Sequence, residues 1–315
     1  MTLVFVSGIR GFLGQAVARR ARQQGFRVCG VDWSSTPSAI EHDVDDVSTT
    51  AVTTESVISL IETNGPPDIF VHAAGSGLVG ASWLDPLKDF ECNVSTTAAS
   101  LHALRNHAPD AVFVLPSSAA VYGNATQGNI REDSPVAPIS PYGSHKLMAE
   151  GLCRQATEMF GVKTAAIRFF SLYGPGLKKQ LLWDIATRLV VRPETLTLSG
   201  DPNASRDFLF VGDAVDLIFA VARKYATESL LVNGGTGHGT TIRDIARILI
   251  ERISPGTELT FDGVVRPGDP LHLVADIGRA RNLGFDPATS LEDGVDAYID
   301  WFIGLQDNKM IGAQP

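Results

Sequence analysis

The segment Gly8-Ile9-Arg10-Gly11-Phe12-Leu13-Gly14 constrains the fold of this chain more than any other feature. It follows the apolar run Leu3–Ser7, which we predict to be a strand, and it opens an amphipathic helix at about 12–24. This order of elements presents backbone N–H groups and a helix N-terminus to a pyrophosphate. Asp32 stands 24 residues after Gly8, at the end of a second predicted strand, where a carboxylate can accept hydrogen bonds from ribose hydroxyls. The pattern predicts a dinucleotide-binding unit.

Asp32 and Arg10 give opposite indications of which dinucleotide is bound. A carboxylate at position 32 repels a 2′-phosphate, which favours NAD over NADP. The Arg10 guanidinium, inside the glycine-rich segment, is able to pair with such a phosphate. We favour the interpretation in which Arg10 is a solvated loop residue, and we therefore expect NAD as the cofactor.

Apolar runs of strand length alternate with amphipathic segments through the first half of the 315-residue chain. Further strands are expected at 26–31, 68–74, 111–115 and 163–170, and helices at about 53–63, 85–107 and 141–160. Such alternation produces right-handed crossovers and a parallel sheet covered by helices on both faces. The expected fold class is therefore α/β, with a Rossmann-like doubly wound sheet.

The alternation loosens after Gly174-Pro175-Gly176, where the expected elements become less regular. Helices are predicted at about 179–191, 213–224, 241–253 and 290–304, and short strands near 195–198, 229–233, 258–262 and 271–275. We expect an NAD-binding Rossmann domain over 1–172. A smaller mixed α/β lobe over 173–315 would bind mainly the substrate, with some of its segments returning to the first domain. A cleft between the two is the natural ligand site.

Composition and charge exclude several classes of function. The net charge is −9 and no Lys/Arg-rich run occurs, so a nucleic-acid partner is not expected. The sequence contains no run of about 18 apolar residues, so we expect no membrane span. The three cysteines are far apart, and no His, Cys or carboxylate cluster has metal-ligand spacing, so we expect reduced thiols and no metal. The N-terminus lacks a signal-like segment, which favours a cytoplasmic protein.

Tyr142, Lys146 and Ser118 form a candidate catalytic group. Tyr142 and Lys146 are four residues apart near the start of the helix expected at about 141–160, so both side chains project from one face. A phenol normally titrates near pH ~10. A nearby ammonium stabilises the phenolate and lowers its pKa. Ser118 lies at the end of the strand predicted at 111–115, where its hydroxyl is able to hold a substrate oxygen.

A series of motifs accompanies these residues along nearly the whole chain. Besides the glycine-rich segment they are Asp43-Val44, His72-Ala73-Ala74-Gly75, Asn93-Val94, Ser117-Ser118-Ala119-Ala120-Val121-Tyr122-Gly123, Tyr142-x-x-x-Lys146, Arg168-Phe169-Phe170-Ser171-Leu172-Tyr173-Gly174-Pro175-Gly176, Arg206-Asp207-Phe208 and Arg266-Pro267-Gly268-Asp269. On these motifs the sequence resembles the extended short-chain dehydrogenases/reductases. Within them it is similar to the NAD-dependent nucleotide-sugar epimerases and dehydratases.

The resemblance implies roles for individual residues. Tyr142 would be the catalytic acid/base, Ser118 would bond the reacting sugar oxygen, and Lys146 would also bond the nicotinamide ribose. The substrate would be a nucleotide-diphosphate sugar, bound by Ser118, Tyr142, Ser171, Arg206 and Arg266. Arginine suits the last two positions because its forked donors match phosphate oxygens. NAD would be bound by Gly8, Arg10, Gly11, Phe12, Leu13, Gly14, Asp32, Asp43, Val44, Ala73, Ala74, Gly75, Asn93, Tyr142, Lys146 and Phe169.

Two departures from the family pattern bear on the reaction. Ser171 stands where an asparagine often contacts the diphosphate region of the substrate, so the anchoring there differs. Ala119-Ala120 stands where 4,6-dehydratases carry Asp-Glu, and neither alanine can transfer a proton. Water loss is therefore disfavoured, while oxidation and reduction at C4 remain open.

We expect a 4-epimerase that acts through a transient 4-keto sugar. The alternative is a reductase or dehydrogenase of nucleotide-4-keto sugars that exchanges its cofactor in each turnover. A non-catalytic dinucleotide sensor on the same fold is a third hypothesis, against which the complete catalytic group counts. By resemblance we also expect a homodimer, formed through the helices at about 85–107 and 141–160.

Two histidines near these motifs are assigned other roles. His72 ends a predicted strand beside the nicotinamide region, and we expect it to bond the backbone rather than act as a base. His145 is adjacent to Lys146 but lies on a different face of the helix. A solvated or packing role is expected for it.

Overall fold

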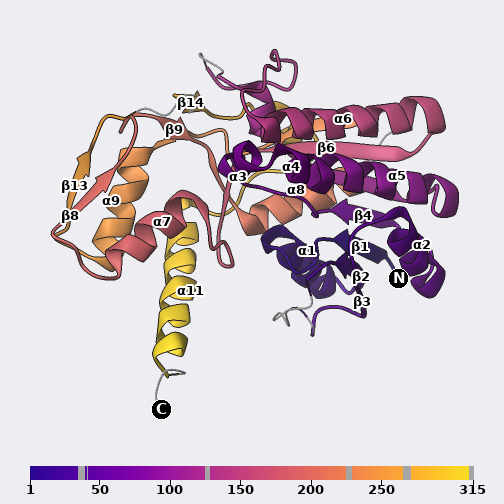
Figure 1. Ribbon diagram of the computed structural model, residues 1–315, viewed down its shortest axis with the longest axis horizontal. Coiled ribbons are helices and arrows are strands. Elements are labelled where there is room, and N and C mark those ends of the chain that lie inside the picture. The colour runs from indigo at the N-terminus through magenta and orange to yellow at the C-terminus, as the bar shows by residue number, and fades with distance from the viewer. Residues whose placement is uncertain (35–39, 41, 125–127, 225–228, 265–270, 312–315) are drawn as a thin grey trace.

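A computed structural model describes residues 1–34, 40, 42–124, 128–224, 229–264 and 271–311, with side chains described as far as Gln306. Figure 1 shows a large half, built on one sheet with helices on both sides, and a smaller half that carries α7 (Gln180–Leu189), α9 (Ile242–Ile253) and α11 (Leu291–Ile311). None of the described helices combines the length and the apolar content needed to cross a membrane.

Seven parallel strands from the described residues form the large sheet, in the order β11-β6-β5-β4-β1-β2-β3. They are β1 (Leu3–Ser7), β2 (Arg27–Asp32), β3 (Asp46–Thr49), β4 (Ile69–His72), β5 (Val112–Ser118), β6 (Lys163–Phe169) and β11 (Leu230–Gly234). The order reverses direction between β1 and β4, which is where doubly wound sheets bind ligands at the carboxyl ends of their strands. The Rossmann-like fold class expected from the sequence is confirmed.

Both faces of the sheet are buried, and alternate residues of each strand serve opposite faces. In β1, Val4 and Val6 pack toward one face while Leu3 and Phe5 pack toward the other. The first face is covered by α1 (Phe12–Gln23), α8 (Val211–Arg223) and α10 (Gly278–Asn282). The second is covered by α2 (Thr54–Asn64), α5 (Thr96–His107) and α6 (Pro141–Phe160). Burial on both faces explains why these strands are almost wholly apolar.

The smaller half has its own apolar core, built on α7, α9 and α11. Short strands complete it: β8 (Thr195–Leu198) with β13 (Glu258–Phe261), β7 (Ser171–Tyr173) with β10 (Phe208–Phe210), and β9 (Ser205–Arg206) with β12 (Thr240–Thr241) and β14 (His272–Leu273). α8 and β11 follow residue 173 in the chain, but they belong to the large half, because α8 packs on the large sheet and β11 pairs with β6 in it.

Most element positions agree with the sequence-based expectations, and the largest difference falls at 85–107. One helix was expected there, but the chain forms α4 (Pro86–Phe90), a π-helical turn η1 (Glu91–Ser95) and then α5. The sequence also gave no indication of β3 or of α3 (Val79–Leu84). Both are short, and β3 is an edge strand with half-buried residues, so neither has the periodicity of a longer element.

Candidate active site

The glycine-rich segment presses its backbone against the end of β4. Gly8 has φ +68°, and a Cβ built on it would lie 2.6 Å from the backbone nitrogen of Ala74. A Cβ on Gly14 would lie 2.1 Å from the carbonyl oxygen of Gly8. Side chains at these positions are therefore excluded by contact. Gly11 caps α1 without a side-chain hydrogen bond, so the first N–H groups of the helix remain open to an anion, as the sequence predicts.

Asp32 is held in a fixed position at the end of β2. Its carboxylate accepts hydrogen bonds from the backbone N–H of Arg10 at 2.9 Å and of Ser34 at 3.0 Å. The Arg10 guanidinium donates to the Ser34 carbonyl at 2.7 Å and to the Thr49 hydroxyl at 3.2 Å. Arg10 is thus not the solvated loop residue that we expected, because β3 and the turn after β2 supply acceptors for it.

These groups line a groove of about 1910 Å³. Its described lining includes Gly8 and Gly11 in the loop after β1, Asp32 and Trp33 at the end of β2, and Ala73–Ser76 after β4. Asp43 and Val44, which were expected to bind NAD, do not belong to this lining: Asp43 lies 3.6 Å from Arg19 in an ion pair and Val44 packs on the core. Their contact with the cofactor stays a prediction.

Tyr142 lies in the first turn of α6, whose start is fixed by its capping residues. Pro141 is the first helical residue, and the Ser140 hydroxyl accepts a hydrogen bond from the backbone N–H of Gly143 at 3.1 Å. The backbone N–H of Tyr142 donates to the Ser82 hydroxyl at 3.1 Å, which ties α6 to α3. The helix therefore starts where the Tyr142 side chain meets the end of β5.

Lys146 and Ser118 complete the group that the sequence predicts. The Ser118 hydroxyl lies near the Tyr142 hydroxyl and acts to lower its pKa. The Lys146 Nζ donates to the carbonyl of Pro116 in β5 at 3.0 Å and lies 5.9 Å from the centre of the Tyr142 ring. All three residues line one pocket of about 630 Å³.

Burial dominates the electrostatics of this group. It raises the pKa of Tyr142, against a lowering by the hydrogen bond from Ser118, and Asp89 adds to the rise. It lowers the pKa of Lys146 to about 8, although Asp89 and Glu150 act in the opposite direction. The lowered pKa of Tyr142 expected from its spacing to Lys146 is therefore not found in the protein alone. The sequence shows the spacing of the two residues but not how far both are desolvated.

The two histidines are buried in side-chain networks. His72 bonds the hydroxyls of Ser7 at 2.7 Å and Thr96 at 3.2 Å, so the expected backbone bond is wrong. Burial lowers the pKa of His72 to about 3, which keeps the ring neutral. His145 lies 2.7 Å from Asp89 through its Nδ1, with both side chains buried behind Lys146. The packing role expected for His145 is the one it has.

Asn93 lies on the π-helical turn η1 and faces Gly75. Its amide nitrogen donates to the Asp89 carbonyl at 3.0 Å. Its Oδ1 is buried, has no hydrogen-bond partner among the described atoms, and would lie 2.7 Å from a Cβ on Gly75. A buried acceptor of this kind suits an N–H or O–H donor beside Gly75.

The pocket that holds the catalytic group is also lined by residues of the smaller half. Phe169, Ser171 and Arg206 line the pocket that holds Tyr142. Ser171 and Arg206 also line an adjoining pocket of about 250 Å³, together with residues of α7 and with Ser199–Asp201. Arg266 lies outside the described residues. Lys179 and Gln180 line the catalytic pocket too. The sequence pattern did not indicate either residue, because they lie at the start of a helix with an apolar face.

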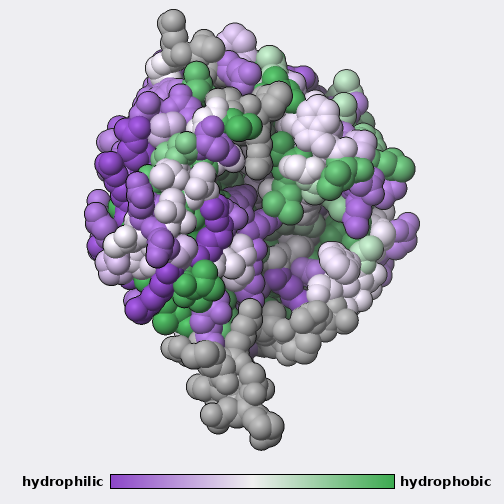
Figure 2. Space-filling model, turned by 60° about the vertical axis from the view of Figure 1, so that its left-hand side comes forward, coloured by the Kyte–Doolittle hydropathy of each residue, from purple (hydrophilic) through white to green (hydrophobic). Residues whose placement is uncertain are grey.

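The three pockets share residues and lie where the two halves of the molecule meet. The groove and the catalytic pocket share Gly11, Phe12 and Ala73–Ser76, while the catalytic and adjoining pockets share Ser171, Leu172, Leu177, Gln180 and Arg206. Figure 2 shows this side of the molecule hollowed, with hydrophilic and hydrophobic residues around the hollow. Within the described part of the chain, no three His, Cys, Asp or Glu side chains gather as metal ligands would.

Comparisons with known proteins agree with this geometry. Residues 4–233 match the model of the NAD-dependent epimerase/dehydratase family. The chain belongs to this family. A UDP-glucose 4-epimerase of Azospirillum brasilense is 30% identical over 317 residues, covering 93% of this chain and 89% of the relative.

Solved structures of similar proteins cover almost the whole chain. A UDP-glucuronic acid 4-epimerase from Bacillus cereus, in complex with UDP-glucuronic acid and NAD, is 25% identical with a TM-score of 0.86, covering 96% of this chain and 100% of the other. MoeE5, in complex with the same two ligands, is 28% identical with a TM-score of 0.84 and covers 96% of this chain and 99% of the other.

Replacing Lys146 with Met should stabilise the cofactor-free protein at pH 7 by about 1–3 kcal/mol, because a buried ammonium costs solvation that a thioether does not. The pKa of Lys146 is about 8 in the fold and 10.5 in its ordinary state. The unfolded chain therefore binds more protons between these values, and wild-type stability should rise with pH over that range. The variant should lack this rise.

Urea unfolding of wild type and Lys146→Met at several pH values between 7 and 10.5 checks this prediction. The matched control is Lys224→Met, which removes an exposed ammonium at the end of α8. If Lys146→Met unfolds more easily than wild type at pH 7 and follows the same pH dependence, the buried ammonium is not destabilising.

Proposed function

We propose that this protein is an NAD-dependent nucleotide-sugar 4-epimerase that acts through a transient 4-keto sugar. The observation that carries the proposal is the shared lining of the pockets. Tyr142 and Ser118 lie in a pocket that opens on one side to the glycine-rich groove and on the other to Arg206 and the small adjoining pocket. A dinucleotide in the groove and a nucleotide sugar anchored at Arg206 would meet beside the Tyr142 hydroxyl.

The donors and acceptors around the groove fit NAD. The open N–H groups at the start of α1 suit a pyrophosphate, and the Asp32 carboxylate suits ribose hydroxyls. The Arg10 guanidinium is engaged with Ser34 and Thr49, which supports NAD rather than a dinucleotide with a 2′-phosphate. Lys146 would bond the nicotinamide ribose from its place beside Pro116. NAD, when bound, would supply the hydride acceptor and donor for C4 of the sugar.

The chain's own residues move the proton and hold the sugar. Tyr142 takes the proton of the C4 hydroxyl as hydride leaves and returns a proton when the carbonyl is reduced. Ser118, which lines the same pocket as Tyr142, positions the same oxygen. Burial raises the pKa of Tyr142 in the protein alone, and a positive charge brought close to the phenol would lower it. Lys146 and a bound oxidised cofactor are the sources of that charge.

The rival functions have less support at this site. A reductase or dehydrogenase of 4-keto sugars would use the same residues, so cofactor exchange is what separates it from an epimerase. A 4,6-dehydratase needs an acid and a base after Ser118, where Ala119 is fully buried and Ala120 also lacks a titratable group. A protein that only senses a dinucleotide does not need Tyr142 and Ser118 together in a pocket whose lining includes Arg206.

We also propose a cytoplasmic homodimer. α6 exposes Met148, Met159 and Phe160, and the Arg105 guanidinium from α5 lies 3.7 Å from the centre of the Phe160 ring. An apolar surface on α6, next to Arg105 of the adjacent helix, suits pairing with a second copy. Burial raises the pKa of the Cys29 thiol to about 11, as expected of an inert thiol in a reducing compartment.

Replacing Tyr142 with Phe should lower kcat by roughly 10²–10⁴-fold, because the proton-transferring hydroxyl is lost while the ring remains. NAD binding should change little. Tyr298→Phe is the matched control: it also removes a buried phenol hydroxyl, but Tyr298 lies in the core of the smaller half, outside the lining of the three described pockets. Turnover close to wild type in Tyr142→Phe would remove this residue from the mechanism.

An epimerase regenerates its cofactor within each turnover, so the purified protein should interconvert C4 epimers without added dinucleotide. UDP-, dTDP- and GDP-hexoses and the corresponding uronates would be incubated with the protein and followed through their anomeric and H4 proton signals by NMR. Nucleotide released on denaturation would show whether NAD is retained. Reduction of a 4-keto sugar that requires added NADH or NADPH, with every epimer unchanged, would establish the reductase instead.

A further inference from the structure

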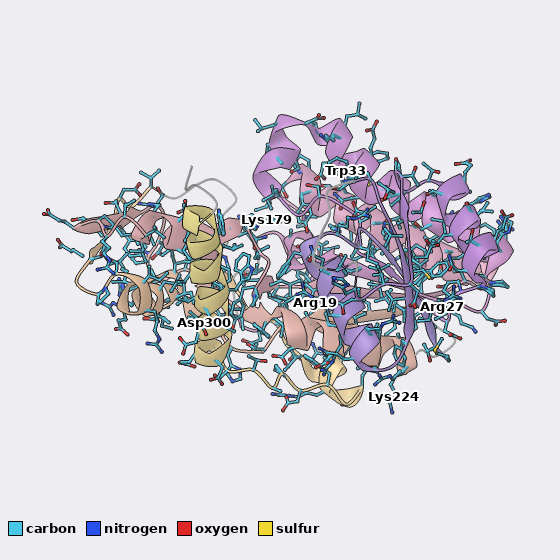
Figure 3. The ribbon with its side chains drawn as sticks, turned by 90° about the horizontal axis from the view of Figure 1, so that it is seen from below. Arg19, Arg27, Trp33, Lys179, Lys224 and Asp300 are labelled. Carbon is cyan, nitrogen blue, oxygen red and sulfur yellow. The ribbon has the colours of Figure 1, made fainter. Side chains whose placement is uncertain are left out.

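Lys179 reaches into the catalytic pocket from the smaller half. It immediately precedes α7, is half-buried, and lines the pocket together with Tyr142 and Ser118. Its Nζ would lie 3.2 Å from a Cβ built on Gly77, in the loop after β4. The missing side chain at Gly77 therefore leaves the space that the ammonium occupies. Figure 3 shows Lys179 where the two halves of the molecule meet.

Among the described residues, no carboxylate pairs with the ammonium of Lys179. Across the described residues it has no hydrogen bond and no ion pair, and burial lowers its pKa. Lys179 also lowers the pKa of Lys146, which lines the same pocket. A desolvated cation without a partner is costly unless a ligand supplies the opposite charge.

The described lining of the catalytic pocket is entirely basic in its charged groups. Lys146, Lys179 and Arg206 contribute to it, and no Asp or Glu does. This is notable in a chain whose net charge is −9. Arg206 lies where the catalytic and adjoining pockets meet, a position that suits the diphosphate of the proposed nucleotide sugar. Lys179 provides a further positive charge, close enough to Lys146 to affect its titration.

We propose that Lys179 pairs with a carboxylate at C6 of the sugar, so that the substrate is a nucleotide uronic acid. This inference rests on the proposed 4-epimerase function. In a hexose ring C6 is attached to C5, next to the reacting C4, so a group at C6 stays within the catalytic pocket while C4 meets Tyr142. A neutral hexose offers the ammonium only a hydroxyl there. A carboxylate gives it a charge-assisted hydrogen bond, which is about twice as strong as a neutral one.

UDP-glucuronate and UDP-glucose differ only at C6, so their binding isolates this contact. Titration calorimetry would use NAD-loaded protein in the Tyr142→Phe background, which prevents turnover. We expect UDP-glucuronate to bind about 10-fold to 100-fold more tightly than UDP-glucose, as a charged hydrogen bond allows. Lys179→Met should remove that preference and leave the affinity for UDP unchanged, while Lys179→Arg should keep most of it.

Lys224→Met is the matched control, since it removes one ammonium from the far end of the large half (Figure 3). It should preserve the preference. Unchanged UDP affinity in Lys179→Met also shows that this variant is folded. Equal affinities for the two sugars in the wild type would overturn the inference, and so would an equal loss for both sugars and for UDP in Lys179→Met, which would place Lys179 on the diphosphate.

The inference and the proposed function fail in different ways. Interconversion of UDP-glucose with UDP-galactose, by a protein that shows no preference for the uronate, would retain the 4-epimerase and overturn the role of Lys179. A Lys179-dependent preference for UDP-glucuronate in binding, without interconversion of any C4 epimers, would retain the carboxylate site and reject the epimerase.

Discussion

The backbone of Gly8 lies so close to Ala74 that no side chain fits between them, and the rest of the site depends on this contact. It joins the end of β1 to the loop after β4, while the contact between Gly8 and Gly14 sets α1 against the same turn. Because the strands are parallel, the ends of β5 and β6 lie at the same edge of the sheet. Ser118 and Phe169 thereby line the catalytic pocket, which shares Gly11 with the groove.

Desolvation is the second determinant of the site. Tyr142 and Lys146 are both buried, so the fold disfavours the phenolate and the ammonium that catalysis requires. Lys179 adds a further cation with a lowered pKa to the same pocket. Ligands that carry a positive nicotinamide and negative phosphate or carboxylate groups would offset these costs. The site is therefore electrostatically incomplete in the protein alone, and the missing charges are those of the proposed cofactor and substrate.

The sequence predicts those features that follow from local pattern. The strand Leu3–Ser7 and the helix Pro141–Phe160 have the expected bounds. Their signals, an apolar run for the strand and capping residues for the helix, lie in contiguous residues. Tyr142, Lys146 and Ser118 meet as predicted, since one helix face and one strand end position them.

Features that depend on distant residues were missed. The contact of Asp89 with His145 and the approach of Lys179 to Gly77 join elements far apart in the chain. The π-helical turn that carries Asn93 falls inside the segment 85–107, for which the sequence pattern predicts one continuous helix. The raised pKa of Tyr142 comes from burial by several elements, whereas the sequence shows only its spacing to Lys146.

In the proposed 4-epimerase mechanism, one enclosed cofactor would hold the hydride from C4 until it returns to the same sugar. The most direct test uses the nucleotide sugar that the protein interconverts, labelled with deuterium at C4, in the presence of excess unlabelled NADH. Mass spectrometry and proton NMR of the C4 epimer would locate the label. If the protein is a 4-epimerase, we expect deuterium to stay at C4 of the product through many turnovers. Replacement of the label by protium would show exchange with the outside cofactor and contradict the epimerase mechanism.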